Sequence, residues 1–440
     1  MYDIVFLGGG LNYAGAVVAA KRGLKVALIE RDMEHIGGTC LNNGCIPSKH
    51  LLSLARVETQ LKNEAFARHR EKLKLDVAVA QKDAVVSKAH RAIEMQCTNA
   101  GVELIEGEGC IYEPHKIEVN GKIYEGRHIV IGTGSTPFIP DGIEYDKEAI
   151  ITSDEVLNLK EFPQNIAIYG SGAIGVEMAS FFAACGVETT LIFRHDHINR
   201  KIHPTLLASL EELLQSLGVT FMPNTTIAQA SSHQKRAKLT TNGDIYEFDK
   251  LLVATGRLPN TSCVKTDAIR VERGIVTDEW FETTLKNHWA IGDCNGKLQL
   301  AHAARAQVLN VVDTITGNKK RLDLDNIPKF FYTLPLQYAA IGRTRAQLEA
   351  QNISYKESFF PLSALALAQF DESKKGGVTL FGDDEGFVIG AEILAPEAQE
   401  LISILSTALA GEMDAKSLIE AVFPHPTFSE AIERAARRLK

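Results

Sequence analysis

Two cysteines near the start of the chain have a spacing that could support redox chemistry. Cys40 and Cys45 lie within residues 37–49, which read GGTCLNNGCIPSK. On a regular helix they would lie about 140° apart around the axis, so their sulfur atoms would not meet. The Asn-Asn-Gly sequence between them permits a distorted turn that could join them. We therefore expect a turn followed by a helix that has Pro47 at its first position and continues through residues 48–55.

The position of Cys45 next to the start of this helix favours a reactive thiol, because the positive end of a helix stabilises a thiolate. Two inert core thiols are the alternative. A metal-binding pair is not favoured, since no second cysteine pair completes a set of four ligands. The sequence thus predicts a catalytic pair and no metal site.

The remaining cysteines carry no such signal. Five of them have no partner at a suggestive spacing, and we expect them to be core thiols: Cys97, Cys110, Cys185, Cys263 and Cys294. Seven cysteines in 440 residues are too few for a disulfide framework, and an odd number leaves at least one thiol free. This usage indicates a reducing compartment, so we expect a cytoplasmic protein.

A glycine-rich turn near the N-terminus is typical of a dinucleotide site. Gly8 and Gly10 follow a short apolar strand, and Glu30 ends the next one. Such glycines let the backbone approach a pyrophosphate, and the acid accepts hydrogen bonds from a ribose. The third glycine is irregular, because Tyr13 stands at its expected position and Gly15 comes two residues later. We interpret this as a shortened turn or helix start; a glycine turn without a cofactor is the alternative.

A second turn, residues 170–175, reads GSGAIG and has three glycines in register: Gly170, Gly172 and Gly175. The strand that follows, at residues 189–193, does not end in an acid, and Arg194 and Arg200 come after it. A carboxylate there would favour a free ribose hydroxyl, whereas arginines suit a 2′-phosphate. A solvated basic loop is the alternative interpretation of these arginines.

Strand and helix patterns place both turns in βαβ units. The units are a strand, a helix and a strand at residues 4–7, 14–21 and 25–29, and again at 165–169, 176–185 and 189–193. Closing strands that end in small residues are expected at 128–134, 250–256 and 289–293. Two units about 160 residues apart indicate two nucleotide-binding domains.

The pattern changes from about residue 327. Alternating strand-like runs surround helical stretches, mainly residues 396–410 and 415–422. This predicts an α+β domain with a mostly antiparallel sheet. The expected fold class is therefore α/β, with two Rossmann-like dinucleotide-binding domains and a C-terminal α+β domain.

Composition excludes several function classes. The formal net charge is −8, which argues against a nucleic-acid binder. Charged residues make up 23% and hydrophobic residues 45%, as in an ordinary globular chain. No apolar run approaches the ~18 residues that would indicate a membrane span, and the N-terminus looks like a strand and not a signal peptide. We expect neither a nucleic-acid partner nor a membrane.

The combined motifs resemble those of the FAD-dependent pyridine nucleotide-disulfide oxidoreductases, the family of dihydrolipoamide dehydrogenase and glutathione reductase. The resemblance covers essentially the full length. Besides both turns and residues 37–49, it includes residues 254–257 (ATGR), 290–293 (AIGD) and the His-Pro-Thr at 425–427. It implies a homodimer whose chain has four regions: an FAD domain (1–145), an NAD(P) domain (146–263), a central segment completing the FAD domain (264–326) and an interface domain (327–440).

The resemblance also implies residue roles. Cys45 would face the flavin, Cys40 would exchange with substrate, and Lys49 would pair with Glu177 near the flavin. Electrons would pass between NAD(P)H, FAD, this disulfide and a disulfide or dithiol substrate. The implied cofactor contacts are Gly8, Gly10, Glu30, Gly38, Thr39, Lys49, Gly134 and Asp293 for FAD, and Gly170, Gly172, Gly175, Arg194, Arg200 and Gly256 for NAD(P).

Near the C-terminus, the resemblance implies that His425 is the acid–base group and that Glu430 orients it. A second interpretation competes for Glu430. The sequence Thr427-Phe-Ser-Glu430 is a good capping box, so the carboxylate could satisfy a backbone N–H instead. The two roles are only partly compatible, and we expect the orienting role.

The motifs disagree about the substrate. The Ile-Pro-Ser-Lys ending of residues 37–49 resembles dihydrolipoamide dehydrogenase, and the helix at 14–21 lacks an arginine that glutathione reductases have there. The spacing of Arg194 and Arg200 instead resembles NADPH-dependent glutathione reductases, although Gly175 is typical of NAD-dependent relatives. We expect a lipoyl-type or small disulfide substrate and a preference for NADPH. A flavin-bound redox sensor or assembly subunit is the non-enzyme alternative.

Overall fold

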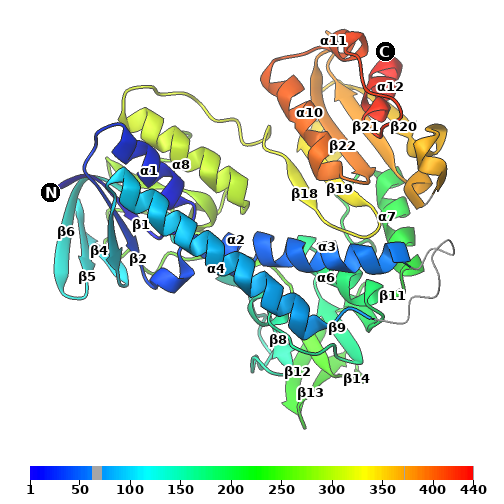
Figure 1. The fold of residues 1–440 in the computed structure, drawn as a ribbon, viewed down its shortest axis with the longest axis horizontal. Coiled ribbons are helices and arrows are strands. Elements are labelled where there is room, and N and C mark those ends of the chain that lie inside the picture. Colours follow the sequence, from blue (N-terminus) through cyan, green and yellow to red (C-terminus); the bar gives the residue numbers. More distant parts are fainter. Residues whose placement is uncertain (62–71, 371, 440) are drawn as a thin grey trace.

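The computed structural model describes residues 1–61, 72–370 and 372–439. The chain forms three bodies, each built on its own main sheet (Figure 1). The first body holds the N-terminal glycine turn, the second holds the other turn, and the C-terminal residues form the third. The predicted class, α/β with a C-terminal α+β part, is confirmed.

The first sheet has the strand order β3-β2-β1-β6-β5-β4, and β17 pairs with β6. Its strands are β1 (Tyr2–Leu7), β2 (Val26–Glu30), β3 (Glu103–Glu106), β4 (Gly109–Glu113), β5 (Lys116–Val119), β6 (Lys122–Ile131) and β17 (His288–Ala290). β1 runs parallel to β2 and β6, with Leu7 opposite Ile29 and Ile131. Parallel strands end at one edge of a sheet, so Gly8 and Glu30 meet there.

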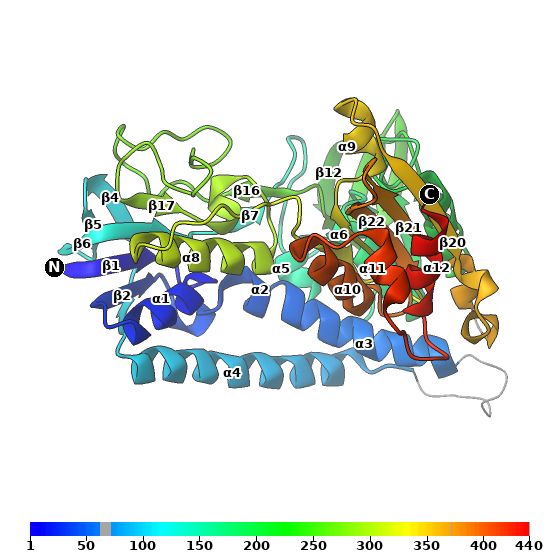
Figure 2. The ribbon, with the colours of Figure 1, turned by 90° about the horizontal axis from the view of Figure 1, so that it is seen from above.

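Three helices pack side by side against this sheet: α1 (Asn12–Lys21), α4 (Leu75–Ala100) and α8 (Ala301–Ile315) (Figure 2). The irregular Gly15 lies inside α1, where a Cβ atom would come 2.4 Å from Cγ2 of Val308 on α8. This glycine therefore serves the close packing of two helices. It is not part of the nucleotide turn.

The cysteine segment forms two helices, α2 (Gly38–Asn42) and α3 (Cys45–Leu61). α3 extends from the first body to the second (Figure 2). Leu51 and Leu52 of α3 are buried in one core with Phe181 and Phe182 of the second body. Hydrophobic burial thus fixes the cysteine-bearing helix against both bodies.

The second sheet is entirely parallel, with the order β11-β10-β9-β15-β8. Its strands are β8 (Ile150–Ile151), β9 (Asn165–Tyr169), β10 (Glu188–Ile192), β11 (Val219–Met222) and β15 (Lys250–Val253). The helices of this body are α5 (Ser153–Val156), α6 (Ala173–Ala184) and α7 (Pro204–Ser216). Five further strands are β7 (Ser135–Pro137), which pairs with β16 (Arg257–Pro259), and the antiparallel β12 (Ile227–His233), β13 (Arg236–Thr241) and β14 (Asp244–Phe248).

The third sheet is antiparallel, with the order β18-β19-β22-β21-β20. Its strands are β18 (Lys329–Phe331), β19 (Gln337–Gly342), β20 (Lys356–Pro361), β21 (Gly377–Gly382) and β22 (Val388–Ala395). The helices of this body are α9 (Arg345–Ala350), α10 (Ala398–Ala410), α11 (Ala415–Glu420) and α12 (Glu430–Arg438).

Several elements differ from the sequence-based expectations, and three of them bear on the site or on the third sheet. Helix α3 begins at Cys45, so Pro47 is its third residue and not its first. Helix α4 and strand β20 were not predicted.

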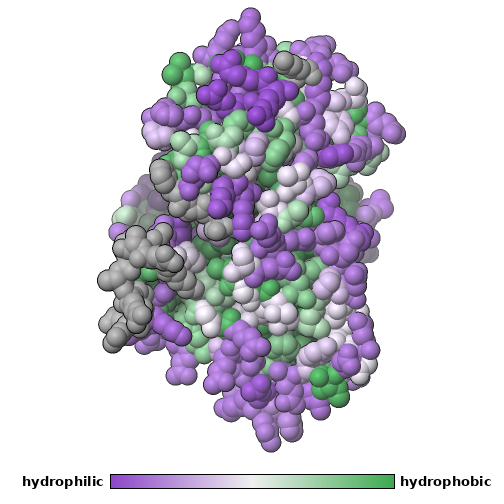
Figure 3. All heavy atoms as spheres, turned by 90° about the vertical axis from the view of Figure 1, so that its right-hand side faces the viewer, coloured by the Kyte–Doolittle hydropathy of each residue, from purple (hydrophilic) through white to green (hydrophobic). Residues whose placement is uncertain are grey.

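On the face at the right-hand side of Figure 1, apolar side chains gather between hydrophilic groups at the two ends (Figure 3). Among the described helices, none combines the length and the apolar character needed to span a membrane.

Candidate active site

The turn between α2 and α3 brings the two cysteines together. A Cβ atom at Gly44 would lie 2.8 Å from the carbonyl oxygen of Thr39, so only glycine lets the two helices join this tightly. The thiol of Cys40 donates a hydrogen bond to the sulfur of Cys45. The structure therefore contains the distorted turn that the sequence suggested, with both cysteines in the dithiol form.

The pair is electrostatically unequal. The hydrogen bond from Cys40 lowers the pKa of the Cys45 thiol to about 7, and the ammonium of Lys49 acts in the same direction against the effect of burial. Donating that hydrogen bond, together with burial, raises the pKa of Cys40. Cys45 also begins α3, where the helix end favours a thiolate. Cys45 is thus the thiol of the reduced pair that ionises near neutral pH, and Cys40 keeps its proton there.

An ion pair between two bodies holds the charge beside Cys45. Lys49 lies one turn along α3, and its Nζ atom is 2.7 Å and 2.8 Å from the two carboxylate oxygens of Glu177 on α6. The backbone N–H of Tyr332 donates to Glu177 at 2.8 Å, and Lys49 also lies over the Tyr332 ring. The Glu177 side chain is only 6% exposed, so the carboxylate has little freedom to move. Tyr332 was not singled out from the sequence.

The first glycine turn has the features of a pyrophosphate cradle. Gly8 has φ +97°, and a Cβ atom there would lie 2.5 Å from the carbonyl oxygen of Gly132. No side chain caps the start of α1, whose N-cap residue is Leu11, so its first N–H groups are available to a phosphate. Glu30 at the end of β2 accepts a hydrogen bond from the backbone N–H of Gly9 at 2.5 Å.

The cysteine segment packs directly on this turn. A Cβ atom at Gly38 would lie 2.9 Å from the Cα atom of Gly10, so the approach needs a glycine at position 38. Thr39 follows within α2 and precedes Cys40 directly. A bound group lying along the turn would thus be near the cysteine pair. Gly134, with φ +72°, has open space around its missing side chain.

A half-buried carboxylate lies beyond the end of β17. Asp293 accepts a hydrogen bond from the hydroxyl of Ser135 at 2.5 Å, and burial raises the pKa of its carboxyl group. Arg257 in turn donates from Nε to the Ser135 hydroxyl at 2.8 Å and from Nη2 to the Ser135 carbonyl at 2.7 Å. Ser135 was not predicted from the sequence. These groups, the first glycine turn and Glu30 together make a donor and acceptor set that suits FAD.

The second glycine turn is packed more tightly than the first. At Gly170, φ is +114° and a Cβ atom would lie 2.3 Å from the carbonyl oxygen of Ala254. At Gly175, a Cβ atom would lie 1.8 Å from the carbonyl oxygen of Gly170. Gly172 forms the N-cap of α6 and leaves its first N–H groups without a side-chain partner. Gly256, with φ +120°, follows β15. The turn is thus built to approach a phosphate.

The two predicted arginines lie on the exposed loop after β10. Arg200 donates from Nε to Asp196 at 2.6 Å, and Arg194 donates from Nε to His195 at 3.2 Å. Strand β10 ends at Ile192 without an acid at its end. A nicotinamide dinucleotide that used Arg200 would therefore compete with Asp196 for its guanidinium group.

His425 and Glu430 form a pair just ahead of α12. Nδ1 of His425 lies 3.0 Å from Oε1 of Glu430, and the same oxygen accepts a hydrogen bond from the backbone N–H of Thr427 at 3.0 Å. One carboxylate oxygen thus makes both of the contacts that the sequence left in competition. The His425 side chain is 75% exposed, and its described hydrogen bonds do not include Cys40 or Cys45 of the same chain.

The other cysteines match the expectation only in part. Cys97, Cys263 and Cys294 are buried, and burial raises their thiol pKa values. The prediction of core thiols was wrong for Cys110 and Cys185, which are partly exposed. Cys110 lies on the edge strand β4, and Cys185 follows the last residue of α6, so neither is enclosed on every side.

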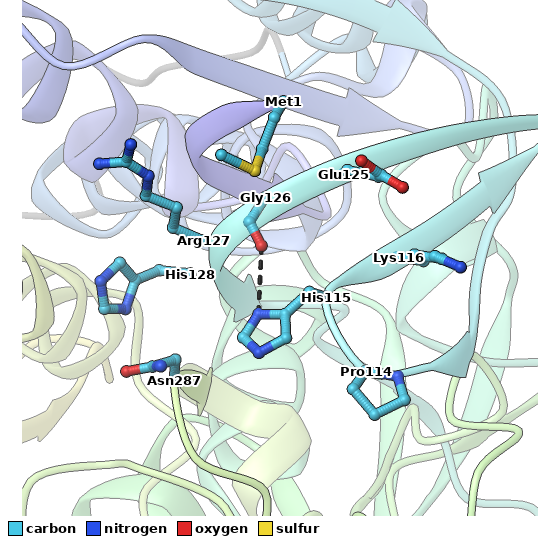
Figure 4. A pocket seen from close by; sticks show the side chains of 9 residues that line it. All are labelled: Met1, Pro114, His115, Lys116, Glu125, Gly126, Arg127, His128 and Asn287. Carbon is cyan, nitrogen blue, oxygen red and sulfur yellow. Dashed lines mark hydrogen bonds between the residues drawn. The ribbon is translucent and has the colours of Figure 1, made fainter.

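A cavity of about 580 Å³ lies away from these groups, at the far end of β6 (Figure 4). Its two basic side chains already have partners: Lys116 pairs with Glu113 at 2.7 Å, and Arg127 pairs with Asp3 at 3.4 Å. The Nδ1–H of His115 donates to the carbonyl oxygen of Gly126 (Figure 4). We therefore do not place the chemistry there.

Comparison with known proteins gives a consistent result. The sequence profile of the pyridine nucleotide-disulphide oxidoreductases matches residues 2–307, and that of their dimerisation domain matches residues 327–436. The chain is 32% identical over 449 residues to a dihydrolipoyl dehydrogenase of Chlamydia muridarum, covering 99% of this chain and 96% of the relative. It is 33% identical over 456 residues to a leghemoglobin reductase of Vigna unguiculata, covering 99% and 87%.

Solved structures resemble this one along the whole chain. LpdA from Mycobacterium tuberculosis has a TM-score of 0.91 at 26% identity, with 99% of both chains covered. The HOCl-induced flavoprotein disulfide reductase RclA from Escherichia coli has a TM-score of 0.89 at 25% identity, with 100% of both chains covered.

Proposed function

Because this chain belongs to the pyridine nucleotide-disulphide oxidoreductase family, we propose that it is an FAD-dependent enzyme in which Cys40 and Cys45 pass electrons between NAD(P)H and a disulfide or dithiol substrate. The observation that carries this proposal is the unequal cysteine pair at the start of α3, with its thiolate beside Lys49. FAD bound along the first turn would supply the exchange of an electron pair between nicotinamide and the cysteines.

The residues of the chain divide the remaining work. His425 takes the proton of the Cys40 thiol, and the resulting Cys40 thiolate attacks one sulfur of the substrate disulfide. The S–S bond of the substrate breaks, a Cys40–substrate disulfide forms, and the departing sulfur takes the proton back from His425. The Cys45 thiolate then attacks the sulfur of Cys40 and releases the second substrate thiolate, which takes a proton from water. Two electrons leave the cysteine pair, and the substrate gains them as two thiols.

We propose a substrate of the dihydrolipoamide dehydrogenase type, with a glutathione reductase-like reduction of a small disulfide as the alternative. The Ile-Pro-Ser-Lys sequence at residues 46–49 and the dihydrolipoyl dehydrogenases among the relatives support the first. Arg194 and Arg200 support the second, since they suit NADPH. The finer cofactor proposal is a preference for NADPH over NADH.

The domain boundaries proposed are 1–145 for FAD, 146–263 for NAD(P), 264–326 for the central segment and 327–440 for the interface. The pairing of β17 with β6 supports the return of the central segment to the first sheet. The few, unbridged cysteines support a reducing, cytoplasmic compartment.

We further propose that the working unit is a homodimer whose active site joins Cys40 of one chain to His425 of the other. The match to a dimerisation domain and the exposure of His425 support this arrangement. Mixing His425→Ala and Cys40→Ser protomers should restore about one active site per mixed dimer. A monomer with full activity at assay dilution would exclude a shared site.

Steady-state turnover tests the function as a whole. The purified protein with FAD should oxidise NADPH or NADH with lipoamide, glutathione disulfide or small disulfides as acceptors. Cys40→Ser should lose this activity and keep FAD. Turnover with none of these acceptors would favour a flavin-bound sensor or assembly subunit instead.

A further inference from the structure

A cavity of about 570 Å³ lies on the C-terminal body at the side chain of His425. Part of its wall is apolar and includes Phe360 and Leu365. Three arginines of α12 also line it: Arg434, Arg437 and Arg438. A substrate sulfur that receives a proton from His425 must therefore come to the mouth of this cavity.

Helix α12 presents its arginines together because its other face is apolar. Ala431, Ile432, Ala435 and Ala436 are buried. Positions 434, 437 and 438 lie on the opposite side, since residues three and four apart share a helix face. Arg434, Arg437 and Arg438 therefore form a single cationic face of this helix.

The cavity carries more positive than negative charge. Glu433 forms ion pairs with two of the arginines: it pairs with Arg437, and it lies 3.5 Å from Arg434. Arg438 donates to the carbonyl oxygen of Phe359 at 2.9 Å and lies 4.8 Å from the centre of the Phe360 ring, so neither of its contacts is a carboxylate. Three cations thus face two acids, and the carboxylate of the second acid, Glu430, already accepts from His425 and Thr427.

We propose that this cavity binds a carboxylate of the substrate, so that the enzyme prefers anionic disulfides to neutral or cationic ones. A guanidinium group pairs with a carboxylate through two parallel hydrogen bonds, and the apolar wall suits the carbon chain between carboxylate and sulfur. The inference rests on the proposed function, because it takes His425 as the acid–base group. It makes the arginines specificity residues, without a part in the sulfur chemistry.

Matched substrates test the charge preference in the FAD-containing enzyme. 3,3′-Dithiodipropionate and cystamine are similar in length but opposite in charge, and lipoate differs from lipoamide by one carboxylate. We expect kcat/KM to be about tenfold or more higher for the anionic member of each pair at low salt, and the difference to shrink as salt is added. Equal values for both members of each pair would overturn the proposal.

The double variant Arg434→Gln/Arg438→Gln keeps side-chain length and removes two charges. We expect KM for 3,3′-dithiodipropionate to rise about tenfold, with kcat within about twofold, and KM for cystamine to stay the same or fall. Lys416→Gln, on the exposed surface of α11 in the same body, is the control for lost charge and should change neither value. Equal losses for both substrates would contradict the inference.

Two further outcomes separate this inference from others. If the arginine variants lose activity only with a lipoylated protein domain and use the free dicarboxylate as before, the cavity docks a protein and the small-ligand assignment is wrong. If the wild type reduces ferricyanide with NAD(P)H but no disulfide at all, the proposed function fails, and the substrate assignment of the cavity fails with it.

Discussion

The ammonium of Lys49 lies within 2.8 Å of both carboxylate oxygens of Glu177, although the two residues are 128 positions apart in the sequence. The pair joins α3 of the cysteine segment to α6 behind the second glycine turn. It therefore fixes a positive charge one helical turn from Cys45 and ties the cysteine pair to the body that we propose for NAD(P).

This geometry predicts opposite effects of two substitutions on Cys45. Lys49→Met removes the attraction that helps to lower the pKa of Cys45 and leaves Glu177 unpaired, so that pKa should rise by about one unit or more. Glu177→Gln removes the opposing negative charge, so the pKa should fall. The alkylation rate of Cys45 against pH, measured in a Cys40→Ser background, reports both changes. Unchanged midpoints in the two variants would show that the ion pair does not influence the thiol.

A second prediction concerns the redox pair itself. In the protein with FAD, Cys45→Ser should abolish the long-wavelength charge-transfer band that forms on two-electron reduction. Cys40→Ser should show this band without any reductant, because Cys45 then has no disulfide partner, and the serine hydroxyl can still donate a hydrogen bond that acts with Lys49 to lower the thiol pKa. The difference in long-wavelength absorbance between oxidised and reduced samples of each variant checks both expectations. If both variants keep wild-type turnover, the two cysteines do not carry the electrons.

A third prediction separates the two contacts of Glu430. Glu430→Gln keeps an oxygen that can accept from His425 and Thr427 but loses the negative charge, so kcat should fall by only about tenfold. Glu430→Ala also removes the acceptor, and the fall in kcat should approach about a hundredfold. A positioning role predicts that neither substitution reduces kcat further in a His425→Ala background. Additive losses of kcat in that background would indicate that Glu430 only stabilises the start of α12. A fall in kcat that occurs only together with a clear fall in Tm would indicate the same.

The sequence predicted those features whose signal is local. Both glycine turns, their flanking strands and the start of the C-terminal body can be recognised within short segments. Contacts between distant segments could not be predicted in this way, and the link from Ser135 to Asp293 across 158 positions is an example. The single Glu430 oxygen that serves both Thr427 and His425 depends on the exact path of the backbone. Gly15 looked like a displaced turn residue because its actual neighbour, Val308, is remote in the sequence.

A fourth prediction concerns the nicotinamide cofactor. With NADPH, Arg194 and Arg200 can both pair with the 2′-phosphate, and we expect kcat/KM to exceed that for NADH by about tens-fold. Solvent exposure and the existing pair with Asp196 keep the factor from being larger. Arg194→Glu/Arg200→Ala should remove the preference, with Lys235→Ala in the same body as the charge control. Equal or better use of NADH by the wild type would refute it and favour an ordinary dihydrolipoamide dehydrogenase.

A buried carboxylate in the third sheet leads to a prediction about stability. Glu392 on β22 is fully buried. Its Oε2 atom accepts hydrogen bonds from the backbone N–H of His203 at 2.7 Å and from the hydroxyl of Tyr338 at 2.8 Å. Its Oε1 atom has no partner among the described residues, and neither has the hydroxyl of Thr379, the cross-strand neighbour of Glu392. Burial raises the pKa of the Glu392 carboxyl group, with the backbone N–H of His203 acting against it.

The sign of the pH effect follows from this raised pKa. The folded protein binds the Glu392 proton more tightly than the unfolded chain does, so the group contributes most to stability below its unfolded pKa, near 4.5, and this contribution is lost as pH rises through the folded value. Glu392→Gln keeps an oxygen for His203 and Tyr338 and places an amide N–H₂ group beside Thr379. The variant should therefore be more stable than wild type by about 1–2 kcal/mol at pH 8, a rise in Tm of a few degrees, with little difference near pH 4.5. Thermal unfolding at both pH values measures this, with the exposed Glu400→Gln on α10 as the matched control. If Glu392→Gln instead lost the same stability at both pH values, the prediction would be wrong. That result would show that the fold needs the carboxylate itself at this position, for a reason other than its hydrogen bonds with His203 and Tyr338.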